Sequence, residues 1–276
     1  MAEARRAPGT TLARVSRVER LTPHMTRVVL GGDGLAGFGA GEYTDHYVKL
    51  LFPAEGATYP EPFDLKRIRA ELPRDRWPST RTYTVRRWDA TTRELAIDVV
   101  HHGDEGIAGP WAARVAPGDE IRFAGPGGGY APSPAADWHL LAGDESALPA
   151  IAAALERLPA GARAHAFVEV AGPGEEQELT SPGDVAVTWL HRGGAPVGAA
   201  LVRAVTGLDF PDGDVQAFVH GEAGFVKELR RYLLVERDLP RERVSISGYW
   251  RTGHDEDGWQ STKGEWNRQV AAEQGR

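Results

Sequence analysis

The sequence contains no cysteine, and this absence narrows the chemistry open to the chain. It excludes disulfide bonds, thiolate catalysis and cysteine-ligated zinc or iron–sulfur centres. Adjacent residues of a strand face opposite ways, so His101 and His102 cannot easily share one metal ion, and we expect no resident metal. Redox chemistry in this chain would therefore need a bound organic cofactor.

Long hydrophobic runs and an excess of positive charge are also missing. No run approaches the roughly 20 apolar residues that would cross a bilayer, and no apolar segment follows the N-terminal arginines as in a signal peptide. Lysine and arginine number 32 against 39 aspartates and glutamates, a net charge of -7, whereas nucleic-acid binding needs a basic surface. We expect a cytoplasmic protein that binds neither membranes nor nucleic acids.

Short β-branched runs separated by glycine-rich turns fill the first half of the sequence. This pattern predicts antiparallel strands. Six strands without a long helix between them are typical of a small β-barrel. The expected strands span residues 12–18, 26–30, 47–52, 81–87, 94–100 and 120–124.

The pattern changes after a proline- and alanine-rich stretch at residues 132–136. Apolar strands then alternate with helices, which predicts a parallel sheet of the nucleotide-binding type. Trp259 and Trp266 in the polar tail favour a terminal helix with one apolar face. The sequence thus predicts a two-domain protein of the β plus α/β class, with a six-stranded antiparallel barrel in residues 1–132 and an α/β domain with a C-terminal helix in 133–276. The expected α/β strands span 138–142, 164–171, 185–190, 215–220 and 244–248, and the expected helices 147–158 and 223–237.

The strand RTYTVR, residues 81–86, carries the first candidate site. Strand alternation places Arg81 and Tyr83 on one face and Thr84 on the other. Tyr83 offers a flat ring for stacking, and Arg81 offers a charged partner for a phosphate. A surface strand with ordinary arginines and a half-buried tyrosine explains the same residues, so the motif alone leaves both interpretations open.

A second candidate site lies at residues 106–113, GIAGPWAA. The glycines indicate a turn that enters a short helix with Pro110 at its first position. Backbone amides at such a helix start can bind a pyrophosphate. A tight loop that uses glycine and proline only for its geometry is the alternative.

Taken in order, several segments together resemble the siderophore-interacting protein family of FAD-dependent ferric-siderophore reductases, within the ferredoxin-reductase-like superfamily. The resemblance extends from about residue 14 to residue 269 and implies that the barrel binds FAD. It further implies that the second domain faces NAD(P)H, although some members use ferredoxin. The segments are RTYTVR, DVVHHG, GIAGPWAARVAPGDEI, AGPGGGY, WHLLAGDESALPAI and SGYWRTG.

The resemblance implies roles for individual residues. Tyr83 would stack on the isoalloxazine ring, and Arg81 would bind the FAD phosphates. Thr84 would lie near the flavin N5 and tune its reactivity, which makes it the one expected catalytic residue. The other expected FAD contacts are Arg86, His102, Gly103, Ala108, Gly109, Trp111 and Ala112.

Asp144, Glu145 and Ser146 follow the first parallel strand, where open α/β sheets bind ligands. The resemblance places this turn, together with the turn at residues 221–223, on the NAD(P)H side. The acidic pair would repel a phosphate unless backbone amides or arginines compensate. Ser146 as a simple helix cap is the alternative.

Three acidic residues follow the second parallel strand. Glu175, Glu176 and Glu178 would disfavour the 2′-phosphate of NADPH, which favours NADH as the electron donor.

Lys49 and Arg251 are the expected substrate contacts. The family resemblance implies that both bind an anionic ferric siderophore beside the flavin, while the polar position of an alternating strand is the alternative for Lys49. We expect a monomer that reduces ferric siderophores with electrons from NAD(P)H or ferredoxin and releases Fe²⁺. A flavin reductase serving another acceptor and a non-enzymatic ferric-siderophore binding protein are the alternatives.

Overall fold

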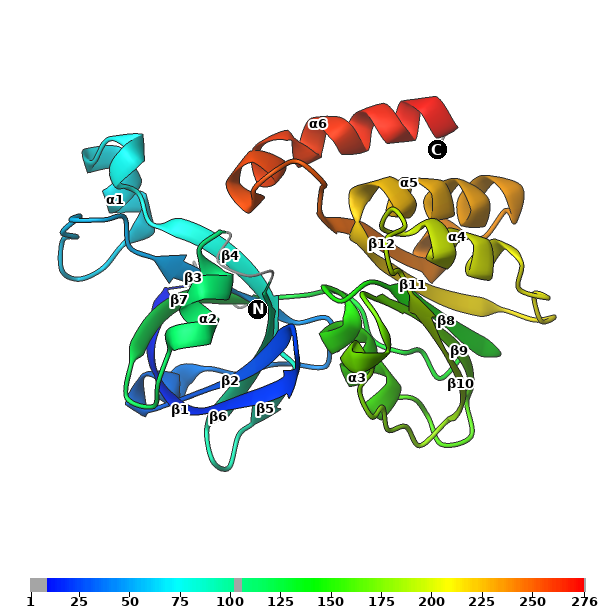
Figure 1. Cartoon of the computed structure of the whole chain (residues 1–276), viewed down its shortest axis with the longest axis horizontal. Coiled ribbons are helices and arrows are strands. Elements are labelled where there is room, and N and C mark those ends of the chain that lie inside the picture. Colours follow the sequence, from blue (N-terminus) through cyan, green and yellow to red (C-terminus); the bar gives the residue numbers. More distant parts are fainter. Residues whose placement is uncertain (1–8, 102–105, 276) are drawn as a thin grey trace, which may run out of the picture. The chain divides into compact units, whose positions relative to one another are not determined.

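The computed structural model describes residues 9–101 and 106–275, and the chain divides into two compact units (Figure 1). Unit 1 contains residues up to 20 together with 26–41 and 46–128. Unit 2 contains residues 21–25, 42–45 and everything from 129 onward. The expected FAD contacts His102 and Gly103 lie outside the described residues.

Unit 1 is built on a curled sheet of seven strands in the order β4-β3-β7-β1-β2-β6-β5 (Figure 1). The β1–β7, β3–β4, β3–β7 and β5–β6 pairs are antiparallel, as the short alternating runs predict. The strands are β1 (Thr10–Thr22), β2 (Met25–Gly31), β3 (Tyr47–Phe52), β4 (Ser79–Thr84), β5 (Arg87–Asp89), β6 (Glu94–Val100) and β7 (Glu120–Gly127).

The seventh strand arises because the expected strand 81–87 is two strands, β4 and β5. Val85 N–H still donates to His46 O next to β3, at 2.6 Å, whereas Arg86 N–H donates to Ala96 O of β6, at 2.9 Å. The chain therefore changes its pairing partner between two adjacent residues and passes from one edge of the sheet to the other. The sequence gives no sign of this change because no glycine or proline interrupts residues 81–89.

Two short helices accompany the sheet of unit 1. The expected helix forms as α2 (Ala108–Arg114), but Pro110 is its third residue and not its first, because the turn at Gly106, with φ of 76°, lets the helix begin earlier. Helix α1 (Leu65–Glu71) was not predicted. Asp64 caps it by accepting hydrogen bonds from the amides of Lys66 and Arg67.

Unit 2 contains the expected parallel sheet, with five strands in the order β10-β9-β8-β11-β12. Its strands alternate with helices, so the α/β class and the C-terminal helix are confirmed. The strands are β8 (Trp138–Gly143), β9 (Arg163–Val170), β10 (Asp184–His191), β11 (Val215–Glu222) and β12 (Val244–Trp250), and the helices are α3 (Leu148–Glu156), α4 (Ala199–Thr206), α5 (Ala223–Arg231) and α6 (Glu256–Gln274).

The central strands β8 and β11 are buried on both faces, as is typical of parallel sheets, whereas the edge strand β10 is largely exposed. Helices α4 and α5 pack over Leu140 and Val219 on one face, and Figure 1 shows α3 on the opposite side. Helix α4 was not predicted, and α5 gives way after Arg231 to a π-helical turn at Tyr232–Glu236.

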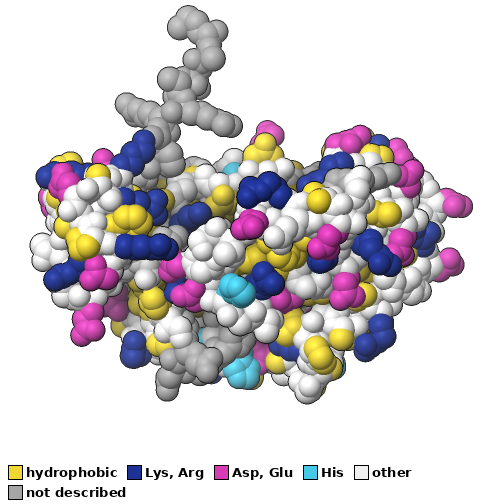
Figure 2. Space-filling view, turned by 90° about the horizontal axis from the view of Figure 1, so that it is seen from above, with side chains coloured by type: hydrophobic (Ala, Val, Ile, Leu, Met, Phe, Trp, Pro, Cys, Tyr) yellow, Lys and Arg dark blue, Asp and Glu magenta, His cyan; other side chains and the backbone are white. Residues whose placement is uncertain are grey.

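Helix α6 confirms the expected terminal helix with an apolar face. The Trp259 ring is fully buried and lies 5.3 Å from the Trp266 ring in an edge-on contact. Within residues 9–101 and 106–275, no helix combines the length and apolar character needed to cross a membrane. Charged side chains of both signs are interspersed over the face in Figure 2.

Candidate functional site

The β3–β4 ladder of unit 1 determines which face each expected site residue occupies. Arg81 lies opposite Leu50, and Tyr83 lies opposite Val48. Directly opposed residues of a ladder share a face, so Arg81 and Tyr83 lie on the same side of the sheet, as strand alternation predicts.

Lys49 and Thr84 lie on the other face of this ladder. Lys49 is opposite Thr82, and Thr84 is opposite Tyr47. The Lys49 side chain is half-buried, and the Thr84 side chain is buried at 7% exposure. The expected substrate cation and the expected flavin N5 contact therefore share one side of two paired strands.

The side chains of β4 suit a flavin nucleotide. Tyr83 is half-buried and packs against the apolar core of unit 1. The Arg81 Nη1 donates to Thr80 O at 2.7 Å, which ties part of the guanidinium to its own strand. An aromatic ring and a guanidinium on one face of β4 match the flat ring and the phosphates of FAD, so these two side chains fit the cofactor. Thr84 lies on the other face, and its contact with the ring nitrogen stays a prediction.

Arg86 occupies a different environment within unit 1. Its Nε lies 4.0 Å from the Asp98 carboxylate, and its side chain is 13% exposed. Asp98 is buried and also accepts hydrogen bonds of 2.7 and 2.8 Å from Arg27. A buried carboxylate with two cationic neighbours thus holds Arg86, and a direct contact of Arg86 with FAD stays a prediction.

Helix α2 carries the other expected FAD contacts. Ala108 and Ala112 are buried, and the Trp111 ring packs edge-on against Phe52 with centroids 5.6 Å apart. The Trp111 amide donates to Ile107 O at 3.2 Å, so that amide is already used within the helix. Gly109 is half-buried at the second helical position, and the pyrophosphate contact of this segment stays a prediction.

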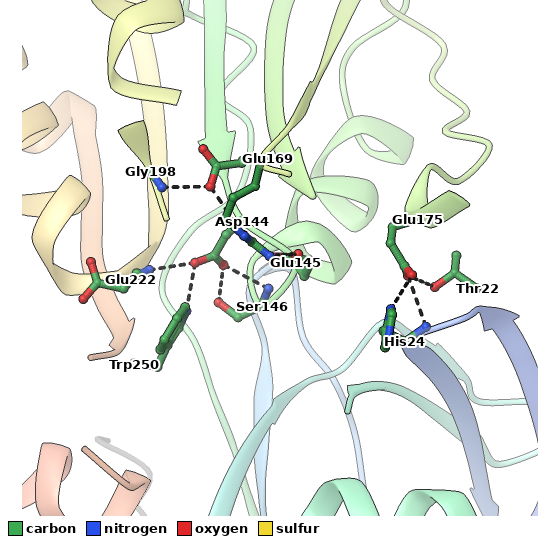
Figure 3. Close-up of polar contacts among 11 residues, drawn as sticks. Thr22, His24, Asp144, Glu145, Ser146, Glu169, Glu175, Gly198, Glu222 and Trp250 are labelled. Carbon is green, nitrogen blue, oxygen red and sulfur yellow. Dashed lines mark hydrogen bonds and ion pairs between the residues drawn. The ribbon is translucent and has the colours of Figure 1, made fainter. Parts of the chain in front are cut away.

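In unit 2, the Asp144 side chain is buried, and its carboxylate points toward Ser146, Glu222 and Trp250 (Figure 3). One oxygen accepts from Ser146 N–H at 2.9 Å and Ser146 Oγ at 2.5 Å, and the other accepts from Glu222 N–H and Trp250 Nε1, both at 2.8 Å. Burial raises the pKa of Asp144 to about 6, against the opposing effect of these donors. Asp144 therefore connects the carboxyl ends of β8, β11 and β12, and its side chain is not free for a nucleotide.

Ser146 does not cap the following helix. Helix α3 begins at Leu148 with Ala147 at the cap position, and the Ser146 hydroxyl donates to Asp144. The capping interpretation is therefore wrong, and Ser146 instead holds the turn through Asp144.

Glu145 is neutralised by Arg192, a residue that sequence reasoning missed. Arg192 donates to both Glu145 oxygens, at 2.5 and 3.1 Å, and lies 3.4 Å from Glu169, which in turn accepts from Gly198 N–H at 2.8 Å. The signal available in the sequence was an arginine directly after the third parallel strand, because all carboxyl ends of a parallel sheet share one edge. Arg192 supplies the compensating cation for Glu145, whereas Asp144 is held by uncharged donors.

Glu175 does not act as expected. It is buried in unit 2, where it accepts hydrogen bonds from the Thr22 hydroxyl at 2.5 Å and pairs with His24 Nδ1 at 2.6 Å (Figure 3). Burial alone would raise the pKa of Glu175, but these hydrogen bonds outweigh it and lower that pKa. Glu175 is therefore occupied by other partners, and Glu176 is itself paired with His191 at 2.7 Å. The preference for NADH over NADPH stays a prediction.

Arg251 follows β12 directly, and its guanidinium carbon lies 5.9 Å from the centre of the buried Trp259 ring. The arginine side chain is half-buried. A cation held over an aromatic face keeps its charge available to an anion at its outer edge. The role of Arg251 toward a chelate stays a prediction.

The comparisons with known proteins account for both units. The siderophore-interacting FAD-binding domain model matches residues 14–130, and the siderophore-interacting protein model matches residues 136–253. The chain is 31% identical to ferric vibriobactin reductase ViuB of Vibrio cholerae, covering 88% of this chain and 90% of that protein. It is 33% identical to the NADPH-dependent ferric-chelate reductase of Escherichia coli, covering 86% and 91%.

A solved structure agrees with these relatives. The siderophore utilization protein from T. fusca superimposes with a TM-score of 0.78 at 42% identity, covering 90% of this chain and 95% of that one. The two family models match consecutive parts of the chain, and the relatives and the solved structure match most of its length, so all of them indicate the same family. The chain belongs to the siderophore-interacting protein family.

Proposed function

We propose that this protein is an FAD-dependent reductase of ferric siderophores, which takes electrons from NAD(P)H and releases iron as Fe²⁺. The observation that carries the proposal is the β3–β4 ladder, where Tyr83 and Arg81 suit a flavin nucleotide and Lys49 lies on the neighbouring strand. The reductases among the relatives support the same reading.

In unit 1, residues of β4 would bind the cofactor, and Lys49 of β3 would bind the substrate. FAD, when bound, would accept a hydride from NAD(P)H and pass single electrons to ferric iron. Tyr83 would support the ring, Arg81 would hold the phosphates, and Thr84 would hydrogen-bond near the ring nitrogen. Lys49 would attract the anionic chelate to the face that it shares with Thr84. Hard oxygen ligands hold Fe²⁺ less tightly than Fe³⁺, so reduction frees the metal.

The turn after β8 would serve the electron donor. Arg192 cancels the charge of Glu145, and Asp144 is enclosed by hydrogen-bond donors, so neither carboxylate would repel a nucleotide phosphate strongly. NADPH and NADH are both compatible with this turn, and reduced ferredoxin is the alternative donor. We further propose a cytoplasmic monomer, which sedimentation and cell fractionation would test.

One experiment separates the proposal from its alternatives. The purified protein should be yellow, should be bleached by NADH, NADPH or reduced ferredoxin, and should then colour a ferrous-specific dye in the presence of a ferric siderophore. A colourless protein that does not retain added FAD would instead be a siderophore binding protein. A reducible flavin without ferrous iron from several chelates would indicate a reductase for another acceptor.

A further inference from the structure

Residues on both sides of Arg251 are held by buried carboxylates from neighbouring strands. The Trp250 indole donates to Asp144 at 2.8 Å, and the Thr252 amide donates to Glu222 at 3.2 Å. Asp144 follows β8, and Glu222 ends β11, so the two carboxylates reach the end of β12 from separate elements of unit 2. We refer to Asp144 and Glu222 together as the carboxylate clamp.

Each member of the clamp is fixed by further bonds. Asp144 accepts from the amide and hydroxyl of Ser146, and it also accepts from the Glu222 amide at 2.8 Å. The second Glu222 oxygen accepts from Gly224 N–H at 2.5 Å at the start of α5. A side chain with both oxygens bonded in this way has little rotational freedom left, so the clamp is rigid where it meets Trp250 and Thr252.

Close packing around the clamp prevents compensating movement. A Cβ added at Gly221, where φ is 139°, would lie 2.7 Å from the Asp144 carboxylate. A Cβ added at Gly248 would lie 3.0 Å from Ala223 and 3.1 Å from Trp259. The Trp259 indole also lies 3.3 Å from Gly248 O as a donor, so the ring beneath Arg251 is tied to β12 itself.

We propose that Asp144 and Glu222 are positioning residues, which set the direction of Arg251 and thereby the affinity for an anionic ferric chelate. The inference rests on the proposed function. A free arginine side chain loses much conformational entropy when it binds a ligand, whereas one whose neighbours are fixed and whose guanidinium lies over Trp259 has lost part of it already. Loosening the clamp should therefore raise KM for an anionic chelate and leave kcat unchanged.

Trp250→Phe tests this most sharply, because it removes the indole N–H and retains an aromatic ring. With ferric citrate as the anionic substrate, we expect KM to rise about three- to tenfold at unchanged kcat and FAD content. KM for the uncharged ferric tris-acetohydroxamate complex should not move. Glu222→Gln, which keeps an acceptor for the Thr252 amide, should have a smaller effect on KM than Glu222→Ala.

The matched control uses the opposite end of the same strands. Asp214 pairs with Arg243 at 2.7 Å, and its side chain is 66% exposed, so Asp214→Asn removes a carboxylate without touching the clamp. KM for ferric citrate should stay at the wild-type value in this variant. The melting temperature of each variant separates loss of folding from loss of positioning.

A double variant decides between the possible failures. In an Arg251→Ala background, Trp250→Phe should add nothing to KM, because the clamp acts only through Arg251. If Arg251→Ala raises KM but Trp250→Phe does not, or if the two effects simply add, the positioning inference is wrong and the proposed function stands. If the wild-type protein does not reduce ferric chelates, the proposed function itself is wrong.

Discussion

Arg192 and Glu145 form a two-point ion pair at the carboxyl edge of the parallel sheet, with contacts of 2.5 and 3.1 Å. Both side chains are nearly buried, at 14% and 11% exposure. Glu145 is thereby paired with a cation, although the sequence around the turn contains none. The pair makes Arg192 part of the candidate nucleotide side of unit 2.

Replacing Arg192 by glutamine should destabilise the protein and weaken donor binding. Removing one member of a buried pair leaves a charge unpaired, here on Glu145 and Glu169, and costs about 3 kcal/mol in free energy of unfolding. KM for NAD(P)H should rise while FAD content holds. Denaturant unfolding and steady-state kinetics check these effects. The control is Arg17→Gln. Arg17 pairs with Glu19 at the surface, and its side chain is 51% exposed, so this variant should change the free energy of unfolding little.

The buried His220 should make stability depend on pH. Burial, with a smaller effect of the Lys263 charge, lowers the pKa of His220 to about 3, whereas the unfolded chain has a value near 6.5. Between these values the unfolded state binds the proton and the folded state does not. The free energy of unfolding should therefore fall on acidification from about pH 6.5, by up to ~1.4 kcal/mol per pH unit.

His220→Phe tests this dependence against a matched control. Its Nε2 lies 3.0 Å from Ser245 Oγ, and its ring stacks on Phe218, so a phenylalanine conserves most of the packing. Unfolding between pH 4 and 7 should be less pH-dependent than in the wild type. His254→Phe at an exposed position should leave the dependence intact. Equal slopes in all three proteins would assign the acid sensitivity to other groups.

Tyr83→Ala should lower FAD retention. The ring packs against the core of unit 1 and is the flat surface on which the isoalloxazine would stack. We expect the ratio of flavin to protein absorbance after gel filtration to fall several-fold, because the variant loses about 0.5–1.5 kcal/mol of stacking. Tyr43→Ala, at a site 47% exposed, should keep full flavin content.

Lys49→Gln should weaken chelate binding and leave the flavin in place. The variant keeps the polarity and most of the length of the side chain but removes the charge that would attract an anionic siderophore. KM for ferric citrate should rise about tenfold at low ionic strength, and the difference from the wild type should shrink as salt is added. Lys66→Gln on the exposed side of α1 provides the comparison. Loss of flavin in the Lys49 variant would contradict the assignment.

Local pattern accounts for most of the fold. The β-branched runs of the first half and the apolar strands of the second predict nearly every strand, and the two tryptophans of the tail predict the apolar face of α6. The errors concern pairing. The partner strand changes between Val85 and Arg86 without a glycine or proline to mark the change, so one expected strand became two.

The sequence by itself determined the two-unit architecture, the parallel sheet and the candidate flavin strand, because periodicity and motif order are local properties of the chain. Only the tertiary structure decided how the charges combine. Arg192 reaches Glu145 across 47 positions, and Asp144 reaches Trp250 across 106. These contacts form because a carboxylate that is buried without hydrogen-bond donors costs free energy, and only the folded chain brings such distant donors close to it.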